Sequence, residues 1–524
     1  MAPWGRRERS ADLTQCARIR SSPPCPVQPK ASTPYTGPRT HLQEMFELGL
    51  IPAAGEGVRA YPATTWMPKV MLEIAGRPII ERNVEILRDA FGIKKIVIIT
   101  GHMAEMIEEH LGDGDRLGVK ITYVRCPDPK IGLARGMLLA ESHLDRPFVT
   151  ILGDEVYLDS NHSQLQPQDQ DWFAWCAVHR TSDPRRIQKN YCLTITDDRI
   201  VDLEEKPEHP TGDMLGCGTY AFQTSIFERI RTTAPSQRSG RVELTDVIRA
   251  AAQDGLIVRP FEVSGDYLNV NCLEDHHTAN HLARTKQFDG FATSLVIPAY
   301  NEEESIAHVV RDFVGHVDEV LVVDNSSSDR TAELAREAGA RVETVSLSGY
   351  GDTIQWGLDN AKGDILIITE ADHSFRSKDI GKFLEFLKDA DMVMGTRTTR
   401  EMIEQGSNMG GLLRLGNIVV GKLIEVLWWS QEPRFTDVGC SYRALWKSTW
   451  VKIREQTKGT GPEFSPEMMI EALRARLRVI EIPVSYHARV GGESKHSSGF
   501  LHVSKTALRM LRLILAKRLG LQSH

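Results

Sequence analysis

Two short apolar runs, about 240 residues apart, constrain the fold of this chain more than any other feature. Residues 50–59 read Leu-Ile-Pro-Ala-Ala-Gly-Glu-Gly-Val-Arg, and residues 295–304 read Leu-Val-Ile-Pro-Ala-Tyr-Asn-Glu-Glu-Glu. Each run has the composition of a buried strand, and each stops abruptly in glycine or in acidic residues. Open α/β sheets bind ligands beyond the carboxyl ends of their strands. The sequence therefore predicts two separate sites for phosphate or nucleotide.

Strand and helix patterns alternate from residue 46 to about 285 and restart at Ser294–Pro298. A chain of 524 residues is too long to fold around a single hydrophobic core. The alternation therefore predicts two α/β domains, each with a mostly parallel or mixed sheet flanked by helices. Helices are expected over Ile79–Phe91 and Ala104–Leu111, and Asn301 is expected to cap another, with Glu304 completing a capping box. The predicted divisions are a disordered extension over 1–44, domains over 45–285 and 286–500, a linker near 284–292, and a basic amphipathic helix over 501–524.

Composition narrows the class of protein. A net charge of −7 argues against nucleic acid as a partner, because proteins that bind nucleic acid have a basic surface. The eight cysteines include no C-x-x-C pair, which favours free thiols in a reducing cytoplasm. No run of 18 apolar residues occurs, so no membrane span is expected. The basic helix near the C-terminus is predicted either to contact the inner face of a membrane or to pack on its own domain.

The first strand end is followed by further motifs in a fixed order. Glycines over 53–59 let backbone N–H groups approach a triphosphate, and Arg59 supplies neutralising charge. The motifs that follow are Pro68-Lys69, Gly132-Leu-Ala134, Gly153-Asp154, Glu205-Lys-Pro207, Glu243-Leu-Thr-Asp246 and Asn269-Val-Asn271. Over about 46–285 this set resembles the sugar-1-phosphate nucleotidyltransferases, including the glucose-1-phosphate thymidylyl- and uridylyltransferases.

The resemblance implies that the first domain joins an NTP to a sugar 1-phosphate and releases pyrophosphate. The residues it implies for nucleotide and sugar phosphate are Ala54, Gly55, Gly57, Arg59, Lys69, Gly132 and Lys206. It implies Mg²⁺ (or Mn²⁺) at Asp154, with Asn269 or Asn271 where many family members have aspartate. An asparagine oxygen ligates Mg²⁺ but adds no charge. A first domain that only scaffolds is therefore kept as an alternative. Glu243 and Asp246 are also explained as helix-start charges.

The second strand end opens another ordered set. Pro298-Ala-Tyr-Asn-Glu302 and Val322-Val-Asp-Asn-Ser-Ser-Ser-Asp-Arg-Thr331 resemble the inverting family-2 glycosyltransferases of the GT-A fold. Further elements are similar to those of the dolichyl- and polyprenyl-phosphate sugar synthases over about 292–500. These elements are Gly395-Thr-Arg397, Arg414 with Asn417, Thr436-Asp-Val-Gly-Cys-Ser-Tyr-Arg443 and Arg489-Val-Gly-Gly-Glu-Ser-Lys495.

This second resemblance implies a donor site and an acceptor site. It implies nucleotide contacts at Pro298, Tyr300, Glu302, Asp324 and Gly351, and a metal at Glu370 and Asp372. It implies cations for the donor diphosphate and the acceptor phosphate at Arg397, Arg414, Arg443, Arg489 and Lys495. Asp437 either positions its loop or acts as the base for an alcohol acceptor.

Together the two resemblances predict a bifunctional enzyme, with two Rossmann-like domains of the nucleotidyltransferase and GT-A folds. The first domain would supply the NDP-sugar that the second transfers to a polyprenyl phosphate. The alternatives are a soluble small-molecule acceptor, or a silent first domain beside a working glycosyltransferase.

Overall fold

The computed structural model describes residues 46–520 apart from 62, 168–170, 406, 408–410, 432 and 491–499. The predictions for residues 1–44 and for Lys495 therefore lie outside the described residues.

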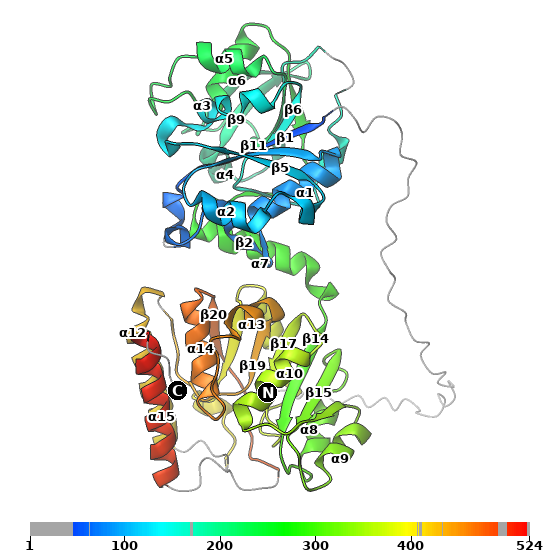
Figure 1. Ribbon diagram of the computed structural model, residues 1–524, viewed down its shortest axis with the longest axis vertical. Helices are drawn as coiled ribbons and strands as arrows, with labels where there is room; N and C mark the ends of the chain where they lie inside the picture. Colours follow the sequence, from blue (N-terminus) through cyan, green and yellow to red (C-terminus); the bar gives the residue numbers. More distant parts are fainter. Residues whose placement is uncertain are drawn as a thin grey trace, which may run out of the picture. The chain divides into compact units, whose positions relative to one another are not determined.

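The first domain is built on a mixed sheet with the strand order β10-β9-β11-β6-β1-β4-β5, and β8 and β12 extend it from β11 (Figure 1). β6, β1, β4 and β5 run parallel, whereas β11 pairs antiparallel with β6. The strands are β1 (Leu48–Ala53), β4 (Lys95–Thr100), β5 (Lys120–Arg125), β6 (Phe148–Ile151), β8 (Ala174–Arg180), β9 (Tyr191–Thr196), β10 (Arg199–Glu205), β11 (Met214–Phe222) and β12 (Val258–Glu262). Small two-stranded sheets pair β7 (Glu155–Leu158) with β13 (Asp266–Asn269), and β2 (Glu73–Ile74) with β3 (Arg77–Pro78).

Helices cover both faces of this sheet. They are α1 (Ile79–Phe91), α2 (Ala104–Leu111), α3 (Leu133–Leu138), α4 (Pro184–Lys189), α5 (Ile226–Thr232), α6 (Leu244–Gln253) and α7 (Leu273–Gln287). Side chains of β1 alternate between two cores, with Ile51 facing the core under α1 and α2, and Leu50 facing the core under α3, α5 and α6. A strand buried on both faces needs an almost continuous apolar run, which explains the sequence of β1.

The second domain repeats the architecture with a different strand order, β16-β15-β14-β17-β19-β18-β20. The first four strands run parallel, and β19 pairs antiparallel with its two neighbours. The strands are β14 (Thr293–Ala299), β15 (Glu319–Asp324), β16 (Arg341–Thr344), β17 (Ile365–Ile368), β18 (Met392–Thr396), β19 (Arg443–Trp446) and β20 (Val479–Pro483). The helices are α8 (Ile306–Phe313), α9 (Thr331–Glu337), α10 (Tyr350–Asn360), α11 (Ile380–Leu387), α12 (Gly411–Leu427), α13 (Lys447–Ile453), α14 (Phe464–Arg474) and α15 (Phe500–Arg518).

The predicted fold class is confirmed, and α1 and α2 have the predicted bounds. Two local predictions are wrong. The linker near 284–292 begins inside α7, which continues to Gln287. Asn301 caps no helix, because α8 begins at Ile306 and the Asn301 Oδ1 instead accepts a hydrogen bond from the Ser328 N–H at 2.8 Å. That bond ties the loop after β14 to the loop after β15.

The C-terminal helix α15 packs on α14. The Lys517 ammonium lies 2.7 Å from Glu467 and 2.8 Å from Glu471, and all three side chains are buried. Ile514 of α15 joins the core beside them. The described part of the chain contains no helix with the length and apolarity to cross a bilayer.

Candidate active sites

The loop after β1 is shaped by one glycine that no other residue can replace without strain. Gly57 has φ +64°, and a Cβ there would lie 2.9 Å from the Cβ of Lys69. Thr64 Oγ1 donates to the Gly57 carbonyl at 2.9 Å. Gly55, in contrast, has open space around it. The loop is therefore fixed by Thr64 and Lys69 at Gly57, while the backbone at Gly55 stays accessible. The predicted contact with a triphosphate requires such an accessible backbone.

Lys69 and Asp154 come from different parts of the sequence and meet beside this loop. Lys69 begins a single 3-10 turn, and Asp154 lies just beyond the end of β6. The Lys69 Nζ is 2.5 Å from the Asp154 Oδ2, and both side chains are partly exposed. A charged pair at the rim of a sheet end keeps both groups within reach of a phosphate or a cation.

A chain of hydrogen bonds links the first loop to the predicted metal ligands. Arg59 Nη2 donates to Asn271 Oδ1 at 2.7 Å, and Asn271 Nδ2 donates to Asn269 Oδ1. Asn269 Nδ2 then donates to Glu155 Oε1 at 2.5 Å. The two asparagines are thus brought next to one another and to the loop.

Glu155 is a residue of this site that the sequence reasoning missed. It is 1% exposed, and a Cβ on Gly218 would lie 2.5 Å from its Oε1. Burial, together with the negative charge of Asp154, raises the pKa of Glu155 to about 8. The signal in the sequence was a second acid directly after the strand-end aspartate, at the start of β7.

These residues line a pocket of about 140 Å³ at the end of the sheet. The predicted residues among its lining are Arg59, Asp154, Lys206, Asn269 and Asn271. Gly132 has φ +88° and starts α3, and the next residue, Leu133, lines the same pocket.

Lys206 and Glu205 stand on one wall of this pocket. The Lys206 Nζ lies 3.2 Å from Glu205, and Thr245 Oγ1 donates to Glu205 at 3.3 Å. Glu243 precedes α6 at the N-cap position but makes no capping hydrogen bond, and it also lines the pocket. The wall therefore presents both carboxylates and an ammonium to a polar ligand.

In the second domain, β14 and β15 end side by side, with Ala299 paired to Asp324. Asp324 is 2% exposed, and its Oδ1 accepts from the Ser327 N–H at 3.3 Å. Tyr300 stands half exposed at the rim, and Glu302 is half buried next to it. The predicted nucleotide contacts Pro298, Tyr300, Glu302 and Asp324 are therefore gathered at one sheet edge.

Glu370 and Asp372 share one arginine. The Arg489 Nε lies 2.9 Å from Asp372 Oδ2, and the Arg489 Nη2 lies 3.6 Å from Glu370 Oε2. Ser441 Oγ donates to Glu370 Oε1 at 2.6 Å. Burial and the neighbouring Asp372 raise the pKa of Glu370 to about 7. The predicted acidic pair and the predicted cation Arg489 are thus in direct contact.

Arg397 and Asp437 form a buried two-point ion pair. Asp437 is fully buried, and its Oδ1 also accepts from the Gly439 N–H at 3.2 Å. Burial alone would lower the pKa of Arg397, but the carboxylate of Asp437 raises it well above its usual value. Of the two roles predicted for Asp437, these contacts favour loop positioning over proton transfer to an alcohol.

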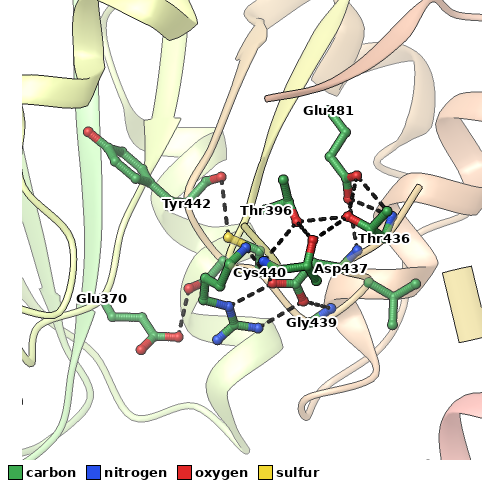
Figure 2. A network of polar contacts seen from close by, with 12 residues as sticks. Glu370, Thr396, Thr436, Asp437, Gly439, Cys440, Tyr442 and Glu481 are labelled. Atoms are coloured by element: carbon green, nitrogen blue, oxygen red, sulfur yellow. Dashed lines mark hydrogen bonds and ion pairs between the residues drawn. The ribbon is translucent and has the colours of Figure 1, made fainter. Parts of the chain in front are cut away.

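Glu481 also stabilises the loop that carries Asp437. Its carboxylate accepts hydrogen bonds from the N–H groups of Thr436 and Asp437, both at 2.8 Å, as Figure 2 shows. The loop that carries Asp437 is therefore fixed by carboxylates at two points.

Two predicted contacts are corrected by burial. Arg443 is 1% exposed, and its guanidinium donates to the carbonyls of Cys440, Val438 and Ser465, so it fastens backbone and does not face a phosphate. Gly351 is covered by the chain near Gly459, whose carbonyl would lie 2.0 Å from a Cβ at that position. Its N–H donates to the Thr460 carbonyl at 2.7 Å and not to a nucleotide.

Arg414 is half buried on α12, three residues before Asn417. A Cβ on Gly439 would lie 3.4 Å from both Asn417 Oδ1 and Arg397 Nη2, which places α12 against the Asp437 loop.

The predicted metal positions offer oxygen atoms, which Mg²⁺ and Mn²⁺ prefer. At the first site these are the Asp154 carboxylate and two amide oxygens, and at the second site two carboxylates. In the described ranges no three His, Cys, Asp or Glu side chains converge as a metal cluster. The donor sets fit a hard cation that shares its coordination with substrate phosphates, not one enclosed by protein alone.

Comparison with known proteins identifies both halves. Residues 48–267 match the family model for nucleotidyl transferases, and residues 294–433 match that for glycosyl transferase family 2. The UTP–glucose-1-phosphate uridylyltransferase of Haloferax volcanii is 31% identical over 228 residues, which is 43% of this chain and 92% of that protein. Its low-salt glycan biosynthesis nucleotidyltransferase is 32% identical over 239 residues, covering 45% of this chain and 65% of that protein.

A third relative and one solved structure complete the comparison. The low-salt glycan biosynthesis hexosyltransferase of the same organism is 30% identical over 238 residues, covering 44% of this chain and 56% of that protein. A crystal structure of a glucose-1-phosphate thymidylyltransferase from Bacillus anthracis aligns with a TM-score of 0.41 and 28% identity, covering 45% of this chain and 95% of that one. The chain therefore belongs to the nucleotidyl transferase family through its first domain and carries a glycosyl transferase family 2 domain after it.

Proposed function

We propose that this chain makes a nucleotide sugar at its first site and transfers the sugar at its second. The observation that carries the first half is the Lys69–Asp154 pair, which stands at the sheet end beside the Arg59–Asn271 contact. Cations, a carboxylate and amide oxygens meet there at the mouth of one pocket.

At the first site, the reaction is attack of a sugar phosphate oxygen on the α-phosphorus of an NTP, with pyrophosphate as the leaving group. Such a transfer depends on positioning and charge neutralisation more than on a protein nucleophile. Arg59 and Lys69 would neutralise the triphosphate, and Lys206 would hold the sugar phosphate. Asp154, with Asn269 or Asn271, would hold Mg²⁺, which supplies further neutralising charge.

At the second site, Asp324 and the rim residues would bind the nucleotide, and Glu370 with Asp372 would hold a divalent cation at the diphosphate. Arg489 already contacts both carboxylates, so it can exchange these partners for a phosphate. Arg414 is a further candidate cation. Arg397 and Asp437 hold the loop that runs from Thr436 to Gly439 in place, and in this proposal they make no direct contact with the reacting atoms.

For the acceptor we propose a polyprenyl phosphate. A phosphate is already ionised near neutral pH, so the transfer needs no strong base. The burial of Asp437, the best base candidate in the sequence, supports an acceptor of this kind over an alcohol. The alternative hypotheses are a soluble small-molecule acceptor and a first domain without catalytic activity.

The first half is tested by incubating the purified chain with each NTP and a set of sugar 1-phosphates and measuring pyrophosphate release. UTP with glucose 1-phosphate is the first pair to try, because a relative acts on that pair by name. One productive pair is expected, with activity lost in Asp154→Ala. No release from any pair would leave the silent-domain alternative.

The second half is tested by supplying the NDP-sugar directly. Formation of a lipid-extractable glycoside with polyprenyl phosphate supports the proposal. Transfer to a water-soluble alcohol, with none to the lipid phosphate, would favour the soluble acceptor.

A further inference from the structure

Two neighbouring helices of the second domain leave large apolar side chains in solvent. On α12 these are Leu415, Val419 and Val426, on α15 they are Leu508 and Leu515, and Leu519 lies directly after α15; each is between 48% and 71% exposed. Trp429, directly after α12, is 73% exposed. The helices lie side by side in Figure 1, and the Arg518 guanidinium of α15 lies 5.9 Å from the ring centre of Trp428. These seven side chains are called the α12–α15 surface below.

Leu415, Val419 and Val426 are spaced by four and seven residues along α12, and Leu508 and Leu515 by seven along α15, so the exposed residues of each helix lie on a single face. The opposite faces are already packed. On α12, Ile424 is fully buried and Gly421 lies against the Phe435 carbonyl. On α15, Ile514 is fully buried, and the Lys517 side chain, 9% exposed, is paired with Glu467 of α14. Each helix therefore has one face packed on the domain and a second, apolar face in solvent, so the exposure does not come from loose packing.

The charges around this surface are basic. Arg509 and Arg512 are exposed on α15, and no acid occurs between Leu508 and Gly520. On α12, Lys422 lies on the exposed side, and the carboxylate of Glu425 is occupied by Lys422 and by the Phe435 N–H. The whole chain, in contrast, has a net charge of −7. Basic residues on and beside an exposed apolar helix face complement an anionic lipid surface.

The same charges disfavour a second copy of this chain as the occupant. A symmetric dimer would place the same patch of each copy face to face. The basic residues of the two copies would then be brought to the same interface, and like charges brought together across an interface are unfavourable.

The inner side of α12 faces the transferase site. Asn417 stands next to Gly439, and Gly439 is held by Asp437. One helix thus separates the Asp437 loop from the exposed apolar face. A phosphate at the depth of lipid headgroups would be one helix diameter, about 10 Å, from that loop.

We propose that the α12–α15 surface docks the second domain on an anionic lipid bilayer and so presents the Asp437 loop to lipid-borne phosphate. The part of this proposal that concerns the lipid-borne acceptor rests on the proposed transferase function, whereas the docking on the bilayer does not.

The test is flotation of the full-length chain with vesicles of phosphatidylcholine alone or mixed with phosphatidylglycerol. Binding to the mixed vesicles is expected, with little binding to pure phosphatidylcholine. Each basic residue near an anionic surface strengthens binding about fivefold, so Arg509→Gln with Arg512→Gln is expected to bind about 25-fold more weakly. Arg311→Gln with Arg336→Gln, both exposed on α8 and α9, is the charge-matched control and is expected to bind as the wild type.

The apolar contribution is tested with Val419→Asp and Leu515→Asp together, which is expected to abolish flotation. Val451→Asp, at an equally exposed valine on α13, is the control that should leave it unchanged. Unchanged flotation of the Val419/Leu515 variant would overturn the proposal. So would a failure of the wild type to float, or light scattering that shows a dimer which this variant dissociates.

Transfer assays separate docking from the acceptor proposal. With polyprenyl phosphate in vesicles, the Val419/Leu515 variant is expected to lose transfer, and with detergent-dispersed polyprenyl phosphate it is expected to retain it. If no variant transfers sugar in any medium but flotation follows the expected order, the acceptor proposal fails and the docking stands. Equal transfer by wild type and variant on vesicles would count against docking.

Discussion

Arg397 binds Asp437 at two points, with Nε 2.8 Å from one carboxylate oxygen and Nη2 3.0 Å from the other. Both residues look like substrate contacts in the sequence, and the structure shows that they satisfy one another. The pair holds the backbone of the loop that runs from Thr436 to Gly439.

Replacing Asp437 with Asn should destabilise the second domain. The change leaves the buried Arg397 charge without its partner, and removing one member of a buried pair costs about 3–5 kcal/mol. Denaturant unfolding of the full chain measures the loss. Glu337→Gln, at an exposed position on α9, is the control and should change stability by less than about 0.5 kcal/mol. A similar small change in Asp437→Asn would contradict the structural role of the pair.

Gly351→Ala should also destabilise the second domain. Its new Cβ would lie 2.0 Å from the Gly459 carbonyl, so backbone must move, and overpacking of this kind costs about 1–3 kcal/mol or more. Gly381→Ala on α11, where a Cβ meets nothing within 4 Å, should stabilise by about 0.4–1 kcal/mol. Melting temperatures of the two variants should therefore shift in opposite directions. Equal shifts would contradict the tight approach at Gly351.

Asp154→Asn should slow pyrophosphate release about 10²–10³-fold, the usual effect of removing one preorganised electrostatic group. Lys69 would lose its carboxylate partner, but the pair is partly exposed, so the fold should persist. Circular dichroism checks the fold, and Asp171→Asn in the same domain should release pyrophosphate at the wild-type rate. Full activity of Asp154→Asn would place the reaction elsewhere.

His162 should make the first domain sensitive to acid. Burial lowers the pKa of His162 to about 4, whereas in the unfolded chain it is about 6.5. Between these values only the unfolded chain binds the proton, so stability is full above pH 6.5 and falls as the pH drops toward 4. The difference of two to three pKa units corresponds to about 3 kcal/mol.

The test for His162 is hydrogen exchange of peptides from β7 and β11 at pH 7 and pH 4.5. Protection should fall at the lower pH in the wild type and fall less in His162→Gln. Identical acid sensitivity in the two proteins would assign the effect to other groups.

Lys517→Met should loosen the C-terminal helix. It leaves the buried Glu467 without a cation, at a cost of about 3–5 kcal/mol, whereas Glu471 keeps its ion pair with Arg474. Hydrogen exchange should rise in α14 and α15. Arg512→Met, on the exposed side of the same helix, should leave exchange unchanged, and equal effects of both variants would contradict the packing of α15 on α14.

The strands and the long helices could be predicted because their patterns are local. β1 and β14 are buried on both faces, which demands apolar runs, and α1 has a clear amphipathic period and a glycine directly after it. Asp154 and the loop that carries Arg59 follow β6 and β1, which are neighbours in one sheet, whereas Asn271 follows β13 of a separate sheet and was expected only through the family resemblance.

What escaped prediction depends on contacts between distant residues. Arg443 looks like a phosphate-binding cation because its charge is visible in the sequence, whereas its three carbonyl partners are not. Gly351 looks like a nucleotide contact because a glycine gives no sign of which backbone approaches it. Glu155 was missed because its importance comes from burial against Gly218 and Asn269, far along the chain.

The central claim is that one chain both makes and uses a nucleotide sugar. The most direct measurement follows label from a radioactive sugar 1-phosphate into the organic phase, with NTP, Mg²⁺ and polyprenyl phosphate present. The lipid-borne label is expected to require the NTP and to disappear in both Asp154→Ala and Asp372→Ala. Adding the unlabelled NDP-sugar should restore glycolipid synthesis to Asp154→Ala only. Label transfer that persists in Asp154→Ala, or an absence of transfer with every NTP and sugar 1-phosphate, would contradict it.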